Sequence, residues 1–132
     1  MFTHVMLGAE DVEASRRFYD AVLGALGVPQ GAPDPKGRVF WRTPRGAFAI
    51  TRPIDGAPAT HANGGTVGFA AASPEAVDAF HAAGLAEGGS TCEDPPGVRP
   101  SAFGDLYLAY LRDPAGNKIC ALHRIATQPS AA

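Results

Sequence analysis

The sequence predicts an α+β fold in which two tandem β-α-β-β-β modules form a cleft-shaped mixed sheet. Three observations support this prediction: an internal repeat covers most of the chain, each half combines one helical pattern with several short apolar runs, and turn residues fall at matching places in the two halves. The chain has 132 residues, and domains cluster near ~100–150 residues. We therefore expect one domain made of two half-domains.

The internal repeat is found when the sequence is shifted against itself. A shift of 62 positions places residues 4–7 on residues 66–69, and Phe18 on Phe80. A shift of 70 positions places residues 42–46 on residues 112–116. A fixed-period repeat indicates a duplicated structural unit. Since the second shift exceeds the first by eight positions, the second module is expected to contain an insertion.

The first module begins with an apolar run at residues 3–8, which predicts a strand. Asp11 follows as an expected N-cap, because its short acidic side chain can accept a hydrogen bond from the first helical turn. Apolar residues then recur at helical spacing as far as Leu26, and Gly27 ends the helix. Residues 39–42 and 47–51 predict two further strands.

The second module repeats this order. Ser73 is the expected N-cap, and Pro74 occupies the first helical position. Gly89 is expected at the end of this helix. Residues 106–112 and 118–123 predict strands, joined by Asp-Pro-Ala-Gly at residues 113–116, which is typical of a type I turn.

These patterns divide the chain into module 1 (residues 1–55), a linker (residues 56–63), module 2 (residues 64–125) and a flexible tail (residues 126–132). A module of roughly 60 residues with one helix buries little surface. We therefore expect the two sheets to complete each other or a partner chain, and we expect a homodimer.

Composition excludes several classes of partner. The formal net charge is −2 and the basic residues are scattered, whereas nucleic-acid binding requires clustered positive charge. No apolar run is long enough to cross ~30 Å of hydrocarbon. The first residues lack a secretory signal, and two cysteines provide no disulfide framework. We expect a cytoplasmic protein with free thiols that binds neither nucleic acid nor membrane.

Two features are shared by both halves or begin the first: the duplicated modules and the His on the first strand. Two more are the helix containing Phe18-Tyr19 and the Asp-Pro-Ala-Gly-Asn-Lys-Ile stretch at residues 113–119. Together these features resemble the vicinal oxygen chelate superfamily. This superfamily includes glyoxalase I, bleomycin-resistance proteins and extradiol dioxygenases. The resemblance covers almost the whole chain. It implies an open cleft between the modules and, in metal-dependent members, one divalent ion held from up to four positions on the first and last strand of each module.

The repeat alignment assigns those four positions to His4 and its partner Thr66, and to Cys120 and its partner Ile50. Only His4 matches the His, Gln or Glu that the resemblance implies, and no carboxylate is present. Zinc could bind His4 and Cys120, but catalytic zinc sites have three protein ligands. We therefore predict no cofactor and keep a divalent metal such as zinc as the alternative.

Other candidate ligand-binding residues are Tyr107 and Tyr110, which alternation places on opposite faces of one strand. Trp41 is the aromatic candidate in the first module. Arg99 lies in the inserted loop at residues 92–104, where it could bind a polar group from a lid or simply be solvated. His4 could act as a base or hydrogen-bond donor, whereas Cys120 could instead be a small buried residue.

The predicted function is binding of a small organic molecule in the cleft without a catalytic metal, similar to the bleomycin-resistance branch. The alternative is a metal-dependent lyase or isomerase of the glyoxalase type, or a dioxygenase. A third possibility is an interaction module without a ligand-sized cavity. The sequence leaves open whether any reaction is catalysed, because one fold can host unrelated chemistries.

Overall fold

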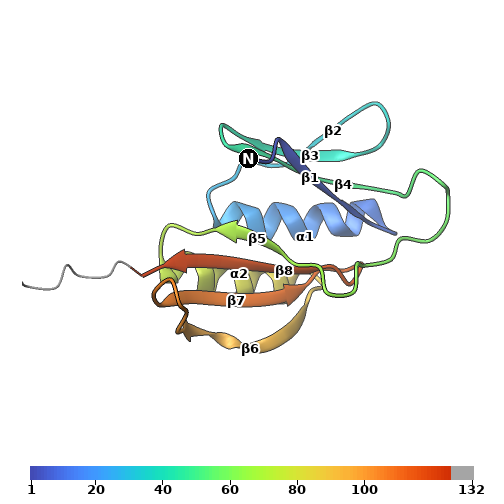
Figure 1. Cartoon of the computed structure of the whole chain (residues 1–132). Helices are drawn as coiled ribbons and strands as arrows, with labels where there is room; N and C mark the ends of the chain where they lie inside the picture. Colours follow the sequence, from blue (N-terminus) through green and yellow to red (C-terminus); the bar gives the residue numbers. More distant parts are fainter. Residues whose placement is uncertain (126–132) are drawn as a thin grey trace, which may run out of the picture.

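The computed structural model describes residues 1–125 and contains two β-α-β-β-β modules (Figure 1). The flexible tail predicted for residues 126–132 lies outside the described residues. The first module comprises β1 (His4–Gly8), α1 (Val12–Ala25), β2 (Ala32–Pro33), β3 (Val39–Thr43) and β4 (Gly46–Thr51). The second comprises β5 (Val67–Ala70), α2 (Pro74–Ala86), β6 (Ser90–Arg99), β7 (Leu106–Arg112) and β8 (Lys118–Arg124).

Each module forms its own four-stranded mixed sheet. The strand order is β1-β4-β3-β2 in the first sheet and β5-β8-β7-β6 in the second. In both sheets the first strand is parallel to the last, and the remaining neighbours are antiparallel. The predicted α+β fold with tandem modules is confirmed. Neither helix of residues 1–125 has the length and apolar character that crossing a bilayer requires.

The helices begin where the sequence predicts. The Asp11 side chain accepts a hydrogen bond of 3.0 Å from the Ala14 amide, and Ser73 accepts one of 3.1 Å from Ala76. These bonds satisfy backbone donors that the first turn leaves unpaired. After α2 the residue in the left-handed region is Gly88, with φ of 90°, one position before the glycine expected to end the helix.

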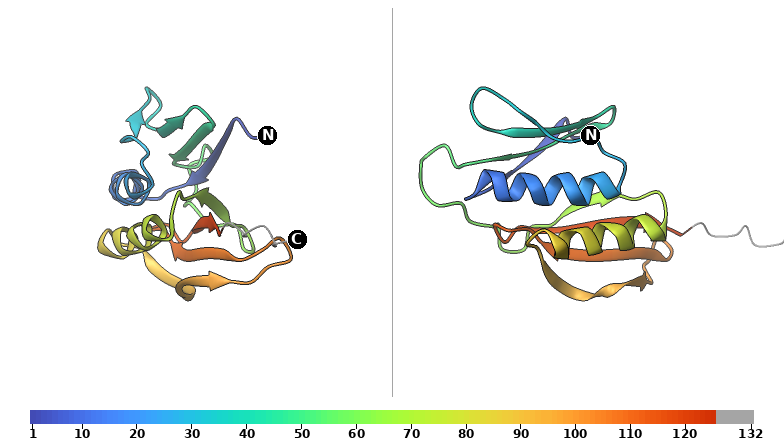
Figure 2. Two further views of the ribbon diagram at one scale, coloured as in Figure 1. Left: turned by 90° about the vertical axis from the view of Figure 1, so that its left-hand side faces the viewer. Right: turned by 180° about the vertical axis from the view of Figure 1, so that it is seen from behind.

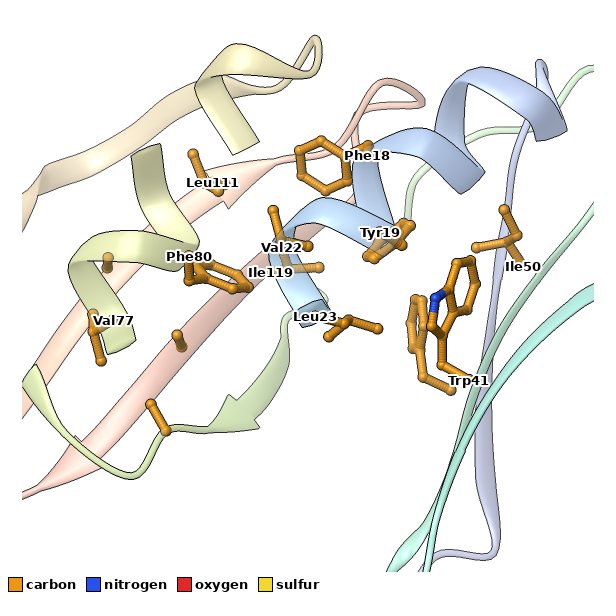
Figure 3. Packing of buried hydrophobic residues seen from close by; sticks show 14 of the residues in the cluster. Phe18, Tyr19, Val22, Leu23, Trp41, Ile50, Val77, Phe80, Leu111 and Ile119 are labelled. Atoms are coloured by element: carbon orange, nitrogen blue, oxygen red, sulfur yellow. The ribbon is translucent and has the colours of Figure 1, made fainter. Parts of the chain in front are cut away.

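The two helices lie on one side of the molecule and share a single core (Figure 2). Side chains of α1 lie between Trp41 of the first sheet and the second module (Figure 3). Phe48 of β4 contacts Phe69 of β5, with ring centroids 5.2 Å apart in an edge-to-face arrangement. The helix-covered faces of both sheets therefore meet in the core, and the helix-free faces turn away from it.

The inserted segment is a strand, which corrects the prediction of a lid loop at residues 92–104. Most of that segment belongs to β6, which pairs with β7 on either side of a bulge between Cys92 and Gly97. The prolines at 95 and 96 fall within this bulge. They are tolerated because β6 is an edge strand, where a missing backbone donor costs little.

Candidate functional site

Three of the predicted site residues, His4, Tyr110 and Cys120, lie on the faces of the two sheets that the helices leave uncovered. Alternation along each strand sends successive side chains to opposite faces, so the core residues identify the face of every neighbour. On the first sheet the helix-free face carries His4, Met6, Phe40, Arg42 and Ala49. On the second sheet it carries Leu108, Tyr110, Lys118, Cys120 and Leu122.

The strand register corrects the predicted pairing of Cys120 with Ile50. Met6 pairs with Ala49 in the first sheet, and Gly68 pairs with Cys120 in the second. Since Met6 and Gly68 are repeat partners, Ala49 is the counterpart of Cys120. Arg42 pairs with Ala47, whereas its repeat partner Arg112 pairs with Lys118, so the connection in the second module contains one residue more. A one-residue slip reverses the face on which a side chain lies. Ile50 is accordingly buried in the core.

The residues at the four positions do not fit a divalent metal. His4 is exposed, and its Nδ1 lies 2.9 Å from Thr3 Oγ1. Thr66 is exposed and precedes β5, Ala49 has no donor atom, and Cys120 is buried. No group of three His, Cys, Asp or Glu side chains within residues 1–125 is arranged to hold a metal ion. Three protein ligands are the usual minimum for a catalytic zinc.

Cys120 and Tyr110 are neighbours on the helix-free face of the second sheet. They pair across β7 and β8, and Cys92 pairs with Tyr110 on the other side, so the three side chains form one row. Burial raises the pKa of the Cys120 thiol to about 11, which keeps it protonated at neutral pH. The thiol is therefore a weak hydrogen-bond donor, unlike a reactive thiolate.

A charged pair borders this row. The Lys118 ammonium lies 4.9 Å from the centre of the Tyr110 ring and forms an ion pair with Glu93. The hydrogen bond that Lys118 donates to the Glu93 carboxylate raises the pKa of Lys118. Glu93 has a φ of 60°, a left-handed conformation that is uncommon for residues other than glycine. No motif in the sequence indicates this pair, because the bulge that brings Glu93 to Lys118 lies in the segment predicted as a loop.

Three other predicted residues lie away from this row. Tyr107 is on the helix-covered face, where its hydroxyl donates a 2.8 Å hydrogen bond to Asp78. Trp41 is 1% exposed and packs in the core, and it also lines the cavity between the modules. The Arg99 guanidinium donates to backbone carbonyls of the bulge in its own strand, at 2.9 and 3.0 Å. Tyr110 and Cys120 are the predicted residues that the structure brings together in this row.

A cavity of about 690 Å³ opens between the edge strands β1 and β5, at the end where α1 stops and the turn between β3 and β4 lies. Two of the predicted residues, His4 and Trp41, line this cavity. Its wall also includes the aromatic residues Phe48 and Phe69 and the exposed Arg45. These further residues were not predicted, because they come from short stretches of both modules that are distant in the sequence.

Two β-α-β-β-β modules that share one core, each with a helix-free sheet face, define a class of folds built from duplicated modules. Residues 1–121 match the family model of the Glyoxalase/Bleomycin resistance protein/Dioxygenase superfamily, and the chain belongs to this superfamily. No curated protein matches the chain.

Several solved structures are similar to this chain. A glyoxalase/bleomycin resistance protein from Albidiferax ferrireducens T118 is 64% identical, with a TM-score of 0.91 over 94% of this chain and 99% of that one. A lactoylglutathione lyase from Agrobacterium tumefaciens is 25% identical, with a TM-score of 0.62 over 93% and 92%. An enzyme of the same superfamily from Burkholderia phytofirmans PsJN is 18% identical, with a TM-score of 0.69 over 93% and 98%, which shows likeness of fold.

Proposed function

We propose that the chain binds a small organic molecule on the helix-free faces of its sheets, without a catalytic metal. The observation that carries the proposal is the chemistry of the four positions: His4, Thr66, Ala49 and Cys120 include no carboxylate and only one imidazole. Ligand sites are mostly apolar with a few convergent polar groups. The face of the second sheet has this character, because leucines flank the Tyr110 and Cys120 row.

We further propose that two copies form the site together. The helix-covered faces of the two sheets meet in the core of one chain, and the cavity that His4 lines does not include Tyr110 or Cys120. A second copy can supply the missing wall, and the resulting homodimer would have two equivalent clefts. The free thiols of Cys92 and Cys120 support a reducing compartment, which we propose is the cytoplasm.

His4 is the candidate polar group of the first sheet. Its Nδ1 is occupied by the contact with Thr3, so Nε2 is the ring nitrogen that a ligand can reach. We propose that His4 provides a hydrogen bond to the ligand from one wall and Tyr110 provides another from the opposite wall. Neither role requires a metal, and no proton transfer is needed for binding.

The proposal is tested with metal-free protein treated with EDTA. Light scattering should give the mass of a dimer. A fragment panel that includes bleomycin should shift the amide NMR signals of Tyr110 and Cys120, and Tyr110→Phe should weaken the same binding while Tyr107→Phe leaves it unchanged. A panel that perturbs neither strand would contradict the proposal.

The alternative is a metal-dependent lyase or isomerase, or a dioxygenase. It predicts one divalent metal per chain by elemental analysis, and turnover of lactoylglutathione that EDTA abolishes and a divalent metal such as zinc restores. The similarity to a lactoylglutathione lyase makes this the appropriate assay. Stoichiometric metal with EDTA-sensitive turnover would replace the binding proposal with the enzymatic one.

A further inference from the structure

The two modules create two equivalent junctions, and only one of them is open. The open junction is the 690 Å³ cavity, which lies beside β1, β5 and the turn between β3 and β4. Its counterpart has a volume of about 160 Å³ and is lined by Leu7, Thr66, Asn117 and Lys118, among others. Leu7 and Thr66 of the closed junction are the repeat partners of Phe69 and His4. Phe69 and His4 both line the open junction. The comparison shows how the duplicated fold closes such a space.

A polar network from the longer connection borders the closed junction at Asn117. Asn117 donates 2.9 Å hydrogen bonds to the Gly8 carbonyl and to Asp113, and the Tyr19 hydroxyl donates to the same Asp113 oxygen. The linker adds Ala62 and Gly65 to the wall. The first module has no such network, because its connection is one residue shorter and Thr43 occupies the place of Asp113.

The walls of the open junction are apolar. They include Val5, Leu23, Trp41, Phe48, Val67 and Phe69. Trp41 and Phe48 belong to the fixed core, with rings 5.8 Å apart, so the floor is held in place by packing. Small-molecule sites occupy ~300–1,000 Å³, and this cavity lies within that range.

The charged groups at the mouth are all of one sign. Arg45 is the only permanently charged side chain in the described wall, and His4 is the other titratable one. No Asp or Glu lines the cavity, and no carboxylate within residues 1–125 pairs with the Arg45 guanidinium. A planar guanidinium is suited to binding a carboxylate through two parallel hydrogen bonds.

We infer that the open junction is a second ligand site, for a small aromatic or branched aliphatic carboxylate. The apolar part of the ligand lies against Phe48 and Phe69, and its carboxylate reaches Arg45 at the mouth. This site lies away from the Tyr110 and Cys120 row, which does not line it, although His4 belongs both to the helix-free face and to the wall of the cavity. Its occupancy does not require the function proposed for the helix-free faces.

Phenylacetate is a suitable probe, with phenylacetamide as its neutral counterpart of the same shape. Calorimetry on the full chain should show phenylacetate binding and at least about tenfold weaker binding of phenylacetamide, since a charged hydrogen bond contributes ~1.5–3 kcal/mol. Arg45→Gln should weaken phenylacetate binding by about the same factor. Arg17→Gln removes an exposed arginine on α1 outside the cavity wall and should leave the binding unchanged.

A second variant tests the place of binding. Val28 is half-buried in the cavity wall, and Val28→Trp should fill the cavity and abolish phenylacetate binding while thermal unfolding shows that the protein still folds. Should Val28→Trp not fold, amide NMR shifts caused by phenylacetate in the unsubstituted chain give the same information, and they should centre on β5 and the turn between β3 and β4. Absence of binding at about 10 mM, binding that Arg45→Gln does not change, or shifts confined to Tyr110 and Cys120 would each overturn the inference.

Discussion

The Tyr19 hydroxyl donates a 2.6 Å hydrogen bond to the Asp113 carboxylate, and this bond joins helix α1 of the first module to the turn between β7 and β8 of the second. Both residues are buried. Asp113 also accepts hydrogen bonds from the amides of Ala115 and Asn117 and from the Asn117 side chain. The contact explains how the two sheets, which share no strand pairing, are fixed relative to each other.

Tyr19→Phe should destabilise the protein by about 1–3 kcal/mol, because it removes one partner of a buried charged acceptor and leaves that acceptor less satisfied. The ring would keep its packing against Phe18 and Phe48, so the loss reports the hydroxyl alone. Urea unfolding followed by circular dichroism measures the change.

Tyr107→Phe is the matched control for this prediction. Tyr107 also donates to a carboxylate, Asp78, but that bond is exposed to solvent, and water replaces a lost exposed partner. Its effect should be at most about 0.5 kcal/mol. Equal effects of the two variants would show that burial of the Tyr19 contact contributes nothing to the junction.

Two helical glycines should respond in opposite ways to alanine. A Cβ at Gly84 would lie 2.3 Å from Leu111 Cδ1 and 3.2 Å from Phe18, so Gly84→Ala should destabilise the protein by roughly 1–3 kcal/mol through overpacking. A Cβ at Gly24 would meet nothing within 4 Å, so Gly24→Ala should stabilise by up to about 1 kcal/mol. Thermal melts of both variants test the pair, and a stabilising Gly84→Ala would refute the close packing of α2 on β7.

Cys120 should make the protein less stable at alkaline pH. Its folded-state pKa is raised from 9.0 to about 11 by burial, so the unfolded chain releases the thiol proton first as pH rises. Stability is then fully present below about pH 9 and declines towards about pH 11, by ~2 kcal/mol for a shift of this size.

Cys120→Ala should flatten this decline, and the measurement is the difference between the two unfolding curves from pH 8 to pH 11. The half-buried Cys92 should also react with a thiol reagent before Cys120 does at pH 8. Faster labelling of Cys120, or parallel pH curves for the two proteins, would contradict a buried protonated thiol.

Much of the fold was predictable because short sequence motifs mark the helix starts and turns that the folded chain forms. Asp11 and Ser73 mark helix starts through their own side-chain hydrogen bonds, and the turn at Asp113 closes through the bond from the Gly116 amide to the Asp113 carbonyl. The candidate site was less predictable. The repeat alignment placed Ile50 opposite Cys120, because identities at residues 42–46 favour a shift of 70, whereas the register of β4 and β8 corresponds to 71.

The contacts that the sequence did not reveal are those between distant elements. Nothing near Tyr19 in the sequence indicates an acceptor 94 residues away. The prolines of β6 favoured a loop over a strand at the sequence level. They are tolerated because β6 is the edge strand of its sheet within residues 1–125. The open junction is lined by short segments of both modules that are far apart in the sequence, so no local pattern indicates the whole of its wall.

Asp20 should support the floor of the open junction through Trp41. One oxygen of its carboxylate accepts hydrogen bonds from Trp41 Nε1 at 2.9 Å and from the Gly31 amide at 2.8 Å. Asp20→Ala leaves both donors without this partner and should destabilise the protein by about 1–3 kcal/mol, with a change in the emission of Trp41, the only tryptophan of the chain. Asp20→Asn retains a carbonyl oxygen that can accept both bonds, so it should restore most of the stability and the emission. Equal losses in the two variants would show that the charge of Asp20, rather than its acceptor geometry, holds Trp41 in place.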